Sequence, residues 1–189
     1  IPRDDTEVVV NLCIDFLKNR TDKKTVDLCS GSGAIAVALD KISGAEVTAV
    51  EIDETAFSYL ETNVKENNSS VKPVMADALK ICDTFADGEL DLIVSNPPYI
   101  KSADIETLQK EVRLEPRLAL DGGEDGYDFY REIVSRWSRK LKKGGALAFE
   151  LGENQADAVK ALMTDKGFSD FKISLDFGGV QRAIIGTLL

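Results

Sequence analysis

The sequence predicts an α/β fold, with a mostly parallel sheet and helices on both of its faces. Aliphatic runs of strand length alternate at least three times with segments of helical periodicity, a pattern typical of parallel sheets. A glycine-containing turn joins the first of these strands to a helix. Two further strand-like runs near the end of the chain are separated by a short Gly-Gly stretch, so we expect them to pair antiparallel. A length of 189 residues suits one domain that spans 1–189.

The first half of the chain contains regular elements that are identified by their apolar spacing. A period near 3.6 residues marks a helix, and a continuous aliphatic run marks a buried strand. Asp53 is suited to cap the helix that follows the second strand. The expected elements are a helix from Thr6 to Phe16, a strand at 24–30, a helix at 33–42, a strand at 45–51, a helix that ends near Asn67 and Asn68, and strands at 71–77 and 89–95.

The second half begins with an irregular stretch that lasts until Tyr127. A helix follows, with apolar residues from Tyr130 to Leu141, and Gly144 is expected to end it as a C′ glycine. The remaining expected elements are a strand at 145–151, a helix at 154–166, and strands at 168–177 and 181–189.

The composition excludes several kinds of site. A formal net charge of −10 argues against a large surface for nucleic-acid phosphates. The three cysteines form no C-x-x-C pair, which argues against a disulfide framework and a zinc site, so we expect a reducing, cytoplasmic compartment and no metal. No apolar stretch approaches the roughly 18 to 20 residues of a membrane span. Because the chain has no histidine, catalytic arrangements that need a histidine base are excluded.

The turn "DLCSGSGAIA" carries a glycine pattern for nucleotide binding. Gly31, Gly33 and Ala36 fit G-x-G-x-x-G/A, and Glu51 ends the next strand, where a carboxylate can accept hydrogen bonds from ribose hydroxyls. The pattern does not distinguish a nicotinamide cofactor from S-adenosylmethionine, and the glycines could also serve only a tight turn. Asp77, after the third strand, is either a loop acid or N-cap or a carboxylate that faces an adenine amino group.

The stretch "SNPPYI" ends the fourth strand with acceptors for a planar NH2 group. Pro97 and Pro98 fix φ and lack N–H groups, so their carbonyls belong to no helix or sheet. The Asn96 side-chain oxygen and the Pro97 carbonyl could accept both N–H bonds of an amide, and Tyr99 adds a flat ring. These hydrogen bonds would strengthen as positive charge develops on the nitrogen, so no general base is needed before transfer of a methyl group.

A structural reading of the same stretch is a Pro-Pro loop in which Asn96 is a turn residue. The glycine turn and Glu51 favour the chemical reading. A nicotinamide enzyme would need a hydride-acceptor site and usually an acid, and the sequence offers no evident candidate for these.

Four segments, "VDLCSGSGAIA", "VEID", "MADAL" and "NPPYI", together resemble the class I S-adenosylmethionine-dependent methyltransferases that modify planar nitrogens. Two more, "IPRDDTE" and "VRLEPRLALDGGEDGYDFYREI", resemble the release-factor glutamine methyltransferase family (HemK/PrmC type), and this resemblance covers essentially the whole chain. It implies a Rossmann-like, seven-stranded sheet with an antiparallel C-terminal strand, and a helical N-terminal domain that is absent from this chain. It also implies a monomer that methylates the glutamine of the Gly-Gly-Gln motif in peptide-chain release factors, without direct contact to nucleic acid or membrane.

The resemblance also implies a role for individual residues. Cys29 stands where the first loop glycine is usual, although its side chain could point into the core, and Ala78 stands where an aromatic residue is often found. The implied cofactor contacts are Asp27, Cys29, Ser30, Gly31, Ser32, Gly33, Glu51, Ile52, Asp77, Ala78 and Asn96. The implied substrate contacts are Arg3, Thr6, Asn96, Pro97, Pro98 and Tyr99, of which Asn96, Pro97 and Tyr99 are the expected catalytic residues.

Two other functions stay open from the sequence. The same NPPY stretch suits an adenine or guanine amino methyltransferase that acts on DNA or RNA, although the net charge opposes it. A cofactor-binding or partner-binding protein without catalytic activity is the non-enzymatic alternative.

Overall fold

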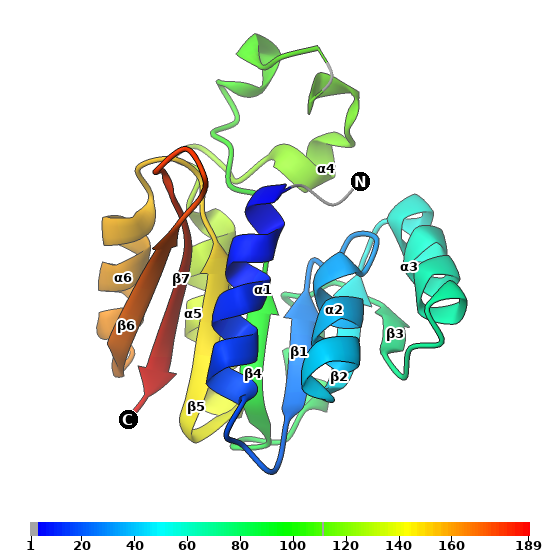
Figure 1. Cartoon of the computed structure of the whole chain (residues 1–189). Coiled ribbons are helices and arrows are strands. Elements are labelled where there is room, and N and C mark those ends of the chain that lie inside the picture. Colours follow the sequence, from blue (N-terminus) through cyan, green and yellow to red (C-terminus); the bar gives the residue numbers. More distant parts are fainter. Residues whose placement is uncertain (1–3, 111) are drawn as a thin grey trace.

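A seven-stranded sheet lies at the centre of the computed structural model, which describes residues 4–110 and 112–189 (Figure 1). The order of the strands across the sheet is β3-β2-β1-β4-β5-β7-β6. Among the predicted site residues, Arg3 is outside the described part of the chain. The strands are β1 (Lys24–Leu28), β2 (Glu46–Glu51), β3 (Lys72–Met75), β4 (Leu90–Ser95), β5 (Leu141–Glu150), β6 (Phe168–Leu175) and β7 (Gln181–Leu188).

The pairing of the strands confirms a mostly parallel sheet with an antiparallel C-terminal strand. β3, β2, β1, β4 and β5 pair parallel, whereas β7 pairs antiparallel with both β5 and β6. The chain builds the sheet outward from β1 in one direction and then continues on the other side with β4. Since ligands of open α/β sheets bind where the strand order reverses, the ends of β1 and β4 are the expected place for a site.

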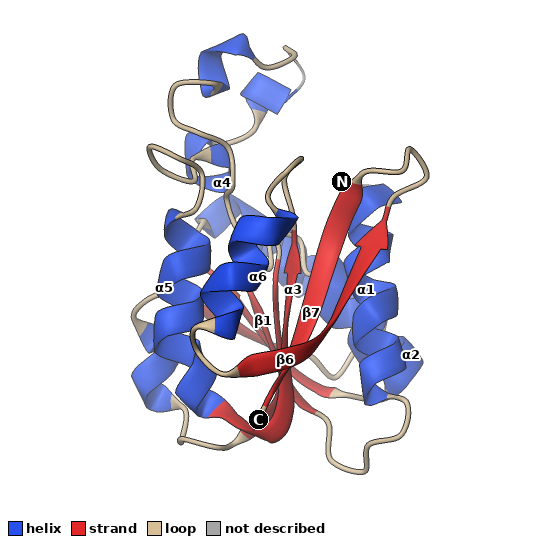
Figure 2. Ribbon diagram, turned by 90° about the vertical axis from the view of Figure 1, so that its left-hand side faces the viewer, coloured by secondary structure: helices blue, strands red, loops and turns tan. Residues whose placement is uncertain are grey.

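Two groups of helices cover the two faces of the sheet (Figure 2). One hydrophobic cluster joins the sheet to α1 (Asp4–Leu17), α2 (Ala34–Ser43) and α3 (Glu54–Glu66). A second cluster joins the other face to α5 (Asp128–Trp137) and α6 (Ala156–Thr164). Because both faces of the central strands are covered, β1, β4 and β5 carry continuous aliphatic runs rather than alternating ones.

The irregular stretch after β4 forms a lobe at the carboxyl ends of the parallel strands, above the sheet in Figure 1. We define this lobe as the described residues 101–110 and 112–126. It contains the short helices η2 (Ile105–Thr107), η3 (Val112–Leu114) and α4 (Arg117–Leu120). The other single-turn helices are η1 (Ile81–Thr84) and η4 (Ser138–Lys140).

The predicted role of Gly144 as the end of a helix is wrong. α5 ends at Trp137, and β5 begins at Leu141 after the single turn of η4. Gly144 has φ +75° within a bulge of β5, where the register with β4 shifts between Leu90 and Leu92. Leu141 lies four residues after Trp137, which looked like helical spacing, but its buried side chain belongs to the sheet beside Leu90.

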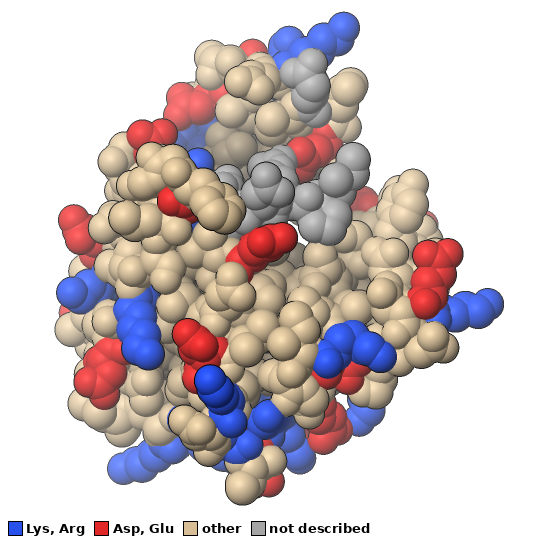
Figure 3. Space-filling view, viewed as in Figure 1, with Lys and Arg blue, Asp and Glu red and all other residues tan. Residues whose placement is uncertain are grey.

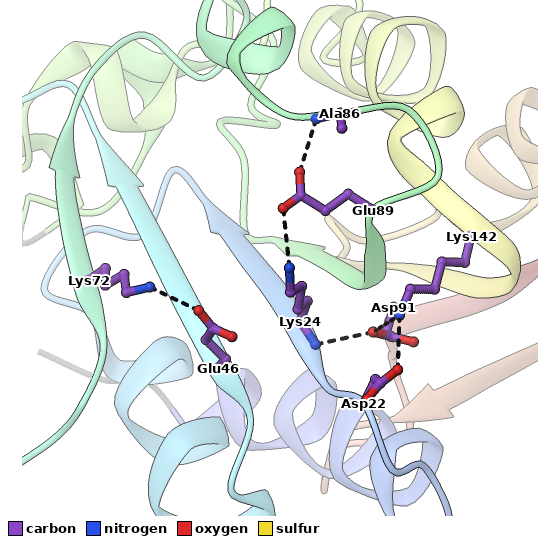
Figure 4. A network of polar contacts seen from close by, with 8 residues as sticks. All are labelled: Asp22, Lys24, Glu46, Lys72, Ala86, Glu89, Asp91 and Lys142. Atoms are coloured by element: carbon purple, nitrogen blue, oxygen red, sulfur yellow. Dashed lines mark hydrogen bonds and ion pairs between the residues drawn. The ribbon is translucent and has the colours of Figure 1, made fainter.

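A network of charged side chains lies at the opposite, amino edge of the sheet (Figure 4). Asp91 is buried, and its carboxylate accepts hydrogen bonds from Lys142 Nζ at 2.9 Å and from the Lys24 backbone N–H at 3.2 Å. Asp91 holds the pKa of the Lys142 ammonium above its ordinary value. At this edge Glu46 and Lys72 form a second pair at 2.8 Å, with both side chains exposed.

Replacing Asp91 by alanine is expected to lower the free energy of unfolding by about 2 to 3 kcal/mol, because a buried carboxylate that accepts two hydrogen bonds is lost. The Lys24 N–H loses this acceptor, and Lys142 keeps only its longer pair with Asp22 at 3.7 Å. Urea denaturation followed by circular dichroism measures this change. The matched control is Glu46→Ala, which removes an exposed carboxylate from a lysine and should cost less than about 1 kcal/mol. Equal losses in the two variants would contradict the structural importance of Asp91.

Candidate active site at the carboxyl edge of the sheet

Four adjacent strands bring the predicted cofactor and substrate residues to one edge. β3 leads to Asp77, β2 ends at Glu51, β1 leads into the glycine loop 29–33, and β4 leads to Asn96. Hydrogen bonds connect the carboxyl ends of neighbouring strands. The Ala76 N–H donates to the Glu51 carbonyl at 2.9 Å, and the Ser95 hydroxyl donates to the Leu28 carbonyl at 2.8 Å.

The glycine loop is tight, and its two glycines have different surroundings. Both have positive φ, +54° at Gly31 and +80° at Gly33. A Cβ at Gly33 would lie 2.3 Å from Leu60 Cδ1, so this glycine lets α2 and α3 approach each other. A Cβ at Gly31 would meet nothing within 4 Å, so the space beside this glycine is open. In the same loop, Ser32 accepts a hydrogen bond from Asn63 Nδ2 at 2.8 Å through its carbonyl.

Cys29 adopts a backbone conformation that usually requires glycine, with φ +56°. Its side chain packs against the part of the core that lies under α5 and α6. This is the inward orientation that the sequence allowed for Cys29. Burial, followed by the charge of Glu51, raises the pKa of the thiol to about 12. The Cys29 side chain is therefore a neutral packing group at physiological pH.

Glu51 connects the glycine loop to the end of β2. One carboxylate oxygen accepts from the Gly31 N–H at 2.7 Å, and the other accepts from the N–H groups of Ile52 and Asp53, each at 2.8 Å. Asp53 caps α3 as predicted and accepts from the Ala56 N–H. The Ile52 side chain beside this cluster is 47% exposed, an apolar surface next to a polar one.

Two buried polar atoms beneath the loop have no hydrogen-bond partner among the described residues, Asp27 Oδ1 and Ser30 Oγ. The other oxygen of Asp27 accepts from the Ala36 N–H at 3.1 Å. Burial raises the pKa of Asp27 to about 8, and the nearby charge of Glu51 acts in the same direction. Burial therefore favours the protonated form of the Asp27 carboxyl group, which can donate a hydrogen bond.

Asp77 caps the turn after β3, which is one of the two roles that the sequence suggested for it. Its carboxylate accepts from the Leu79 N–H at 2.8 Å and pairs with Lys80 at 3.0 Å. The Ala78 side chain is buried in the core, and its carbonyl accepts from Trp137 Nε1 at 2.9 Å. At Ala78 only the backbone is therefore suited to face a ligand.

The turn after β4 places two acceptors at the carboxyl edge. Asn96 is half-buried, and Pro97 and Pro98 are buried. Within the described part of the chain, no hydrogen bond engages the Asn96 side chain or the Pro97 carbonyl. The turn lies next to the glycine loop because β4 pairs with β1, with Ser95 opposite Leu28.

Two glycines of the lobe pack against the backbone of this turn. The Ile100 N–H donates to the Leu120 carbonyl at 3.0 Å, and the Ile100 carbonyl accepts from the Gly122 N–H at 2.8 Å. A Cβ at Gly122 would lie 2.8 Å from Tyr99 Cα, and one at Gly126 would lie 2.6 Å from the Tyr99 carbonyl oxygen. The run "EPRLALDGGEDG" therefore supports the NPPY turn directly, a contact that was not predicted from the sequence.

Sequence reasoning also missed Gln155 and Glu150. Gln155 Nε2 donates to the Tyr99 carbonyl at 3.0 Å, and its only signal in the sequence is a polar residue near the start of a predicted helix. Glu150, at the end of β5, is buried and accepts from the Thr6 hydroxyl at 2.8 Å. Thr6 is thus brought to the carboxyl edge, beside the strand that neighbours β4.

The described residues contain no group of three or more histidine, cysteine, aspartate or glutamate side chains that could hold a metal ion. A search of the same residues for a helix long and apolar enough to cross a membrane also found none.

Comparisons with known families and sequences agree with one another. A family model described as methyltransferase small domain matches residues 4–115. A protein of Geobacter sulfurreducens named release factor glutamine methyltransferase is 41% identical over 191 residues, which span 100% of this chain and 65% of that protein. A protein of Bordetella pertussis with the same name is 36% identical, over 100% of this chain and 69% of that protein. The chain thus spans about two thirds of the length of these relatives.

Solved structures share the fold at low sequence identity. The hMettl16 catalytic domain, in complex with MAT2A 3′UTR hairpin 1, has a TM-score of 0.73 and 18% identity, covering 100% of this chain and 71% of that chain. A methyltransferase from Pyrococcus furiosus has a TM-score of 0.68 and 23% identity, covering 94% of this chain and 82% of that chain. These similarities confirm the predicted Rossmann-like, seven-stranded class I methyltransferase sheet.

Proposed function

The chain belongs to the methyltransferase small domain family and, within it, to the release factor glutamine methyltransferases; on this basis we propose that it methylates the side-chain amide nitrogen of the glutamine in the Gly-Gly-Gln motif of peptide-chain release factors. The methyl donor in this proposal is S-adenosylmethionine. Residues 1–189 act as the catalytic domain. The proposal includes a monomer in the cytoplasm that needs no metal and makes no direct contact with nucleic acid or membrane.

The observation that carries the proposal is the pair of acceptors at the carboxyl end of β4. The Asn96 side-chain oxygen and the Pro97 carbonyl accept the two N–H bonds of the substrate amide. An amide nitrogen is a poor nucleophile because its lone pair is delocalised, which is also why rotation of a peptide bond has a barrier of roughly 18 to 20 kcal/mol. Both hydrogen bonds strengthen as the nitrogen becomes positively charged, so they stabilise the transition state more than the bound substrate.

The reaction proceeds without a histidine, which this chain lacks. The nitrogen loses its proton only after the methyl group has been transferred, when that proton has become acidic. Tyr99 offers its ring to the flat amide, and Pro98 keeps the turn rigid. Thr6, and Arg3 by family resemblance, are the further substrate contacts that we propose.

The residues around the glycine loop fit S-adenosylmethionine, which supplies an electrophilic methyl group when bound. Gly31 is open on the side where a Cβ would otherwise point, and Asp27 Oδ1 and Ser30 Oγ are buried polar atoms without a described partner. Glu51 accepts from the ribose hydroxyls, and Ile52 contacts the adenine. The remaining proposed contacts come from Cys29, Ser32, Gly33, Asp77, Ala78 and Asn96.

Replacing Glu51 by alanine is expected to weaken the binding of S-adenosylmethionine by about 1 to 3 kcal/mol, because the ribose hydroxyls lose their acceptor. Isothermal titration calorimetry measures the change. Asp53→Ala is the control, since it removes a neighbouring carboxylate whose role is to cap α3. Unchanged affinity in the Glu51 variant would exclude Glu51 from the cofactor site.

A second candidate function is methylation of an amino group on RNA or DNA. It is favoured by the likeness of the fold to the hMettl16 catalytic domain, whose structure contains an RNA hairpin. The net charge of −10 opposes it, and on the face in Figure 3 the basic side chains are interspersed with acidic ones.

The two functions are separated by one labelling experiment. The protein is incubated with S-adenosylmethionine that carries a tritiated methyl group, and with a release factor, ribosomal RNA or DNA as acceptor. Label in the Gly-Gly-Gln peptide, lost when that glutamine is replaced, supports the proposal. Label in RNA or DNA but not in the release factor would refute it.

A further inference from the structure

The side-chain amide of Gln155, the residue before α6, has a partner for every hydrogen bond that it can make. Nε2 donates to the Tyr99 carbonyl at 3.0 Å and to the Gly126 carbonyl at 3.2 Å. Oε1 accepts from the Gly152 N–H at 2.9 Å and lies 3.1 Å from the Tyr130 hydroxyl. That hydroxyl is also 2.9 Å from the Glu150 carbonyl, so its single proton is shared between two acceptors. With 7% of its surface exposed, Gln155 is an ordered, buried amide.

The two N–H bonds of this amide join two separate segments. Tyr99 belongs to the turn that carries Asn96 and Pro97, and Gly126 is the last residue of the lobe. Their carbonyl groups converge on Nε2, and without a donor between them a buried and a part-buried acceptor would face each other. Gly152 leaves little room for movement, since a Cβ there would lie 2.7 Å from Gln155 Oε1 and 3.0 Å from Tyr99 Cδ2.

The segment from Ser95 to Ile100 is held at both ends, and Gln155 adds a contact to the peptide that joins Tyr99 to Ile100. At one end, Ser95 belongs to β4, and its hydroxyl bonds to the Leu28 carbonyl. At the other end, Ile100 makes two backbone hydrogen bonds to the lobe. Pro97 and Pro98 have fixed φ, which leaves few free torsions between the Tyr99 peptide and the Pro97 carbonyl, so a shift of the one displaces the other. The position of the Tyr99 carbonyl therefore affects the direction of the two acceptors, the Asn96 side-chain oxygen and the Pro97 carbonyl.

We propose that Gln155 is a positioning residue for methyl transfer, whose Nε2 orients the Asn96 and Pro97 acceptors by fixing the Tyr99 carbonyl. This inference rests on the proposed function of the NPPY turn. Gln155 itself touches neither substrate nor cofactor and acts through the backbone. The packing of α6 alone would need only the Oε1 side of the amide, which faces Gly152 and Tyr130.

The two sides of the amide can be separated by substitution. Gln155→Glu keeps the shape and the Oε1 acceptor but replaces both N–H donors by an oxygen. Gln155→Met keeps the length and removes all polar atoms. The control is Tyr130→Phe, which removes a hydroxyl from the Oε1 side of the same network and leaves both Nε2 hydrogen bonds in place.

In the labelling assay with a release factor at saturating cofactor, Gln155→Glu and Gln155→Met are expected to lower kcat by about 10- to 100-fold, because a displaced acceptor loses most of its effect. The KM for S-adenosylmethionine is expected to stay unchanged. Tyr130→Phe should retain the kcat of the wild-type chain. As the pH falls from 8 to 6, the ratio of variant to wild-type kcat should rise for Gln155→Glu only, because a buried glutamic acid regains a proton and with it one donor.

Hydrogen exchange provides a readout that does not depend on activity. The amides of Ile100 and Gly122, which bond across the turn and the lobe, are expected to exchange faster in both Gln155 variants, whereas those of β1 stay protected. Tyr130→Phe should leave the Ile100 and Gly122 amides as slow as in the wild-type chain.

The outcomes separate this inference from the proposed function. If folded Gln155→Glu and Gln155→Met keep wild-type kcat and slow Ile100 exchange, Gln155 is not a positioning residue. If Tyr130→Phe loses as much kcat as they do, the network has only a general structural role and the inference also fails. A wild-type chain that labels no release factor refutes the proposed function, while the exchange data still decide whether Gln155 holds the turn.

Discussion

Replacing Asn96 by alanine is expected to lower the rate of methyl transfer to a release factor by about 10² to 10³, the usual effect of removing one oriented partner of the transition state. The alanine variant keeps the Pro97 carbonyl but loses the side-chain oxygen, so the substrate amide is held by only one of its two N–H bonds. Single-turnover kinetics with a saturating amount of labelled S-adenosylmethionine measure the chemical step directly.

The affinity for S-adenosylmethionine should change little in this variant, because Asn96 is only one of the proposed cofactor contacts and the glycine loop and Glu51 remain intact. Asn67→Ala is the matched control, the same substitution at an exposed asparagine that caps the far end of α3. It should turn over at the wild-type rate. A folded Asn96→Ala chain with near-normal turnover would show that the amide is not activated in the way proposed.

Gly126→Ala is expected to have the second largest effect, because it combines a strained backbone with a collision at the NPPY turn. Gly126 has φ +82°, where a residue with a side chain loses about 1 to 2 kcal/mol. The added Cβ would also lie 2.6 Å from the Tyr99 carbonyl oxygen. The turn must therefore move, and a displacement of this size is expected to lower kcat about 10²-fold.

Gly44→Ala is the control that separates these two causes. Gly44 follows α2 at the amino edge of the sheet and has φ +67°, and a Cβ at this position would meet nothing within 4 Å. The variant should lose stability in urea denaturation but keep its turnover rate. Equal turnover in the two folded variants would mean that the contact between Gly126 and Tyr99 does not matter for the reaction.

The elements that the sequence predicted well are those in which neighbouring residues decide the outcome. The aliphatic runs of β1 and β4 form strands because helices cover both faces of the sheet, and this burial is readable as a continuous apolar run. The glycine loop and the Asp53 cap depend on local backbone geometry, which glycine and aspartate specify by themselves.

The predictions that failed or were missing depend on residues far apart in the chain. Leu141 continues the apolar spacing of α5, and only its pairing with Leu90 shows that it belongs to a strand. Gln155 is 56 positions from Tyr99, and no periodic pattern connects a side chain of one segment to a carbonyl of another. The glycines of the lobe are likewise visible as a motif, but nothing in the motif indicates that they pack against the NPPY backbone.

By itself, the sequence determined the class of fold, and it supplied the proposals for the chemistry of the NPPY turn and for the residues that hold an adenosine, because these follow from local propensities and from the functional groups of the residues. Only the tertiary structure decided what surrounds them. The strand order brings the ends of β1 and β4 together, the lobe glycines admit the backbone of the turn, and Gln155 donates a hydrogen bond to the Tyr99 carbonyl. These contacts arise from packing between distant segments, and packing is a property of the folded chain as a whole.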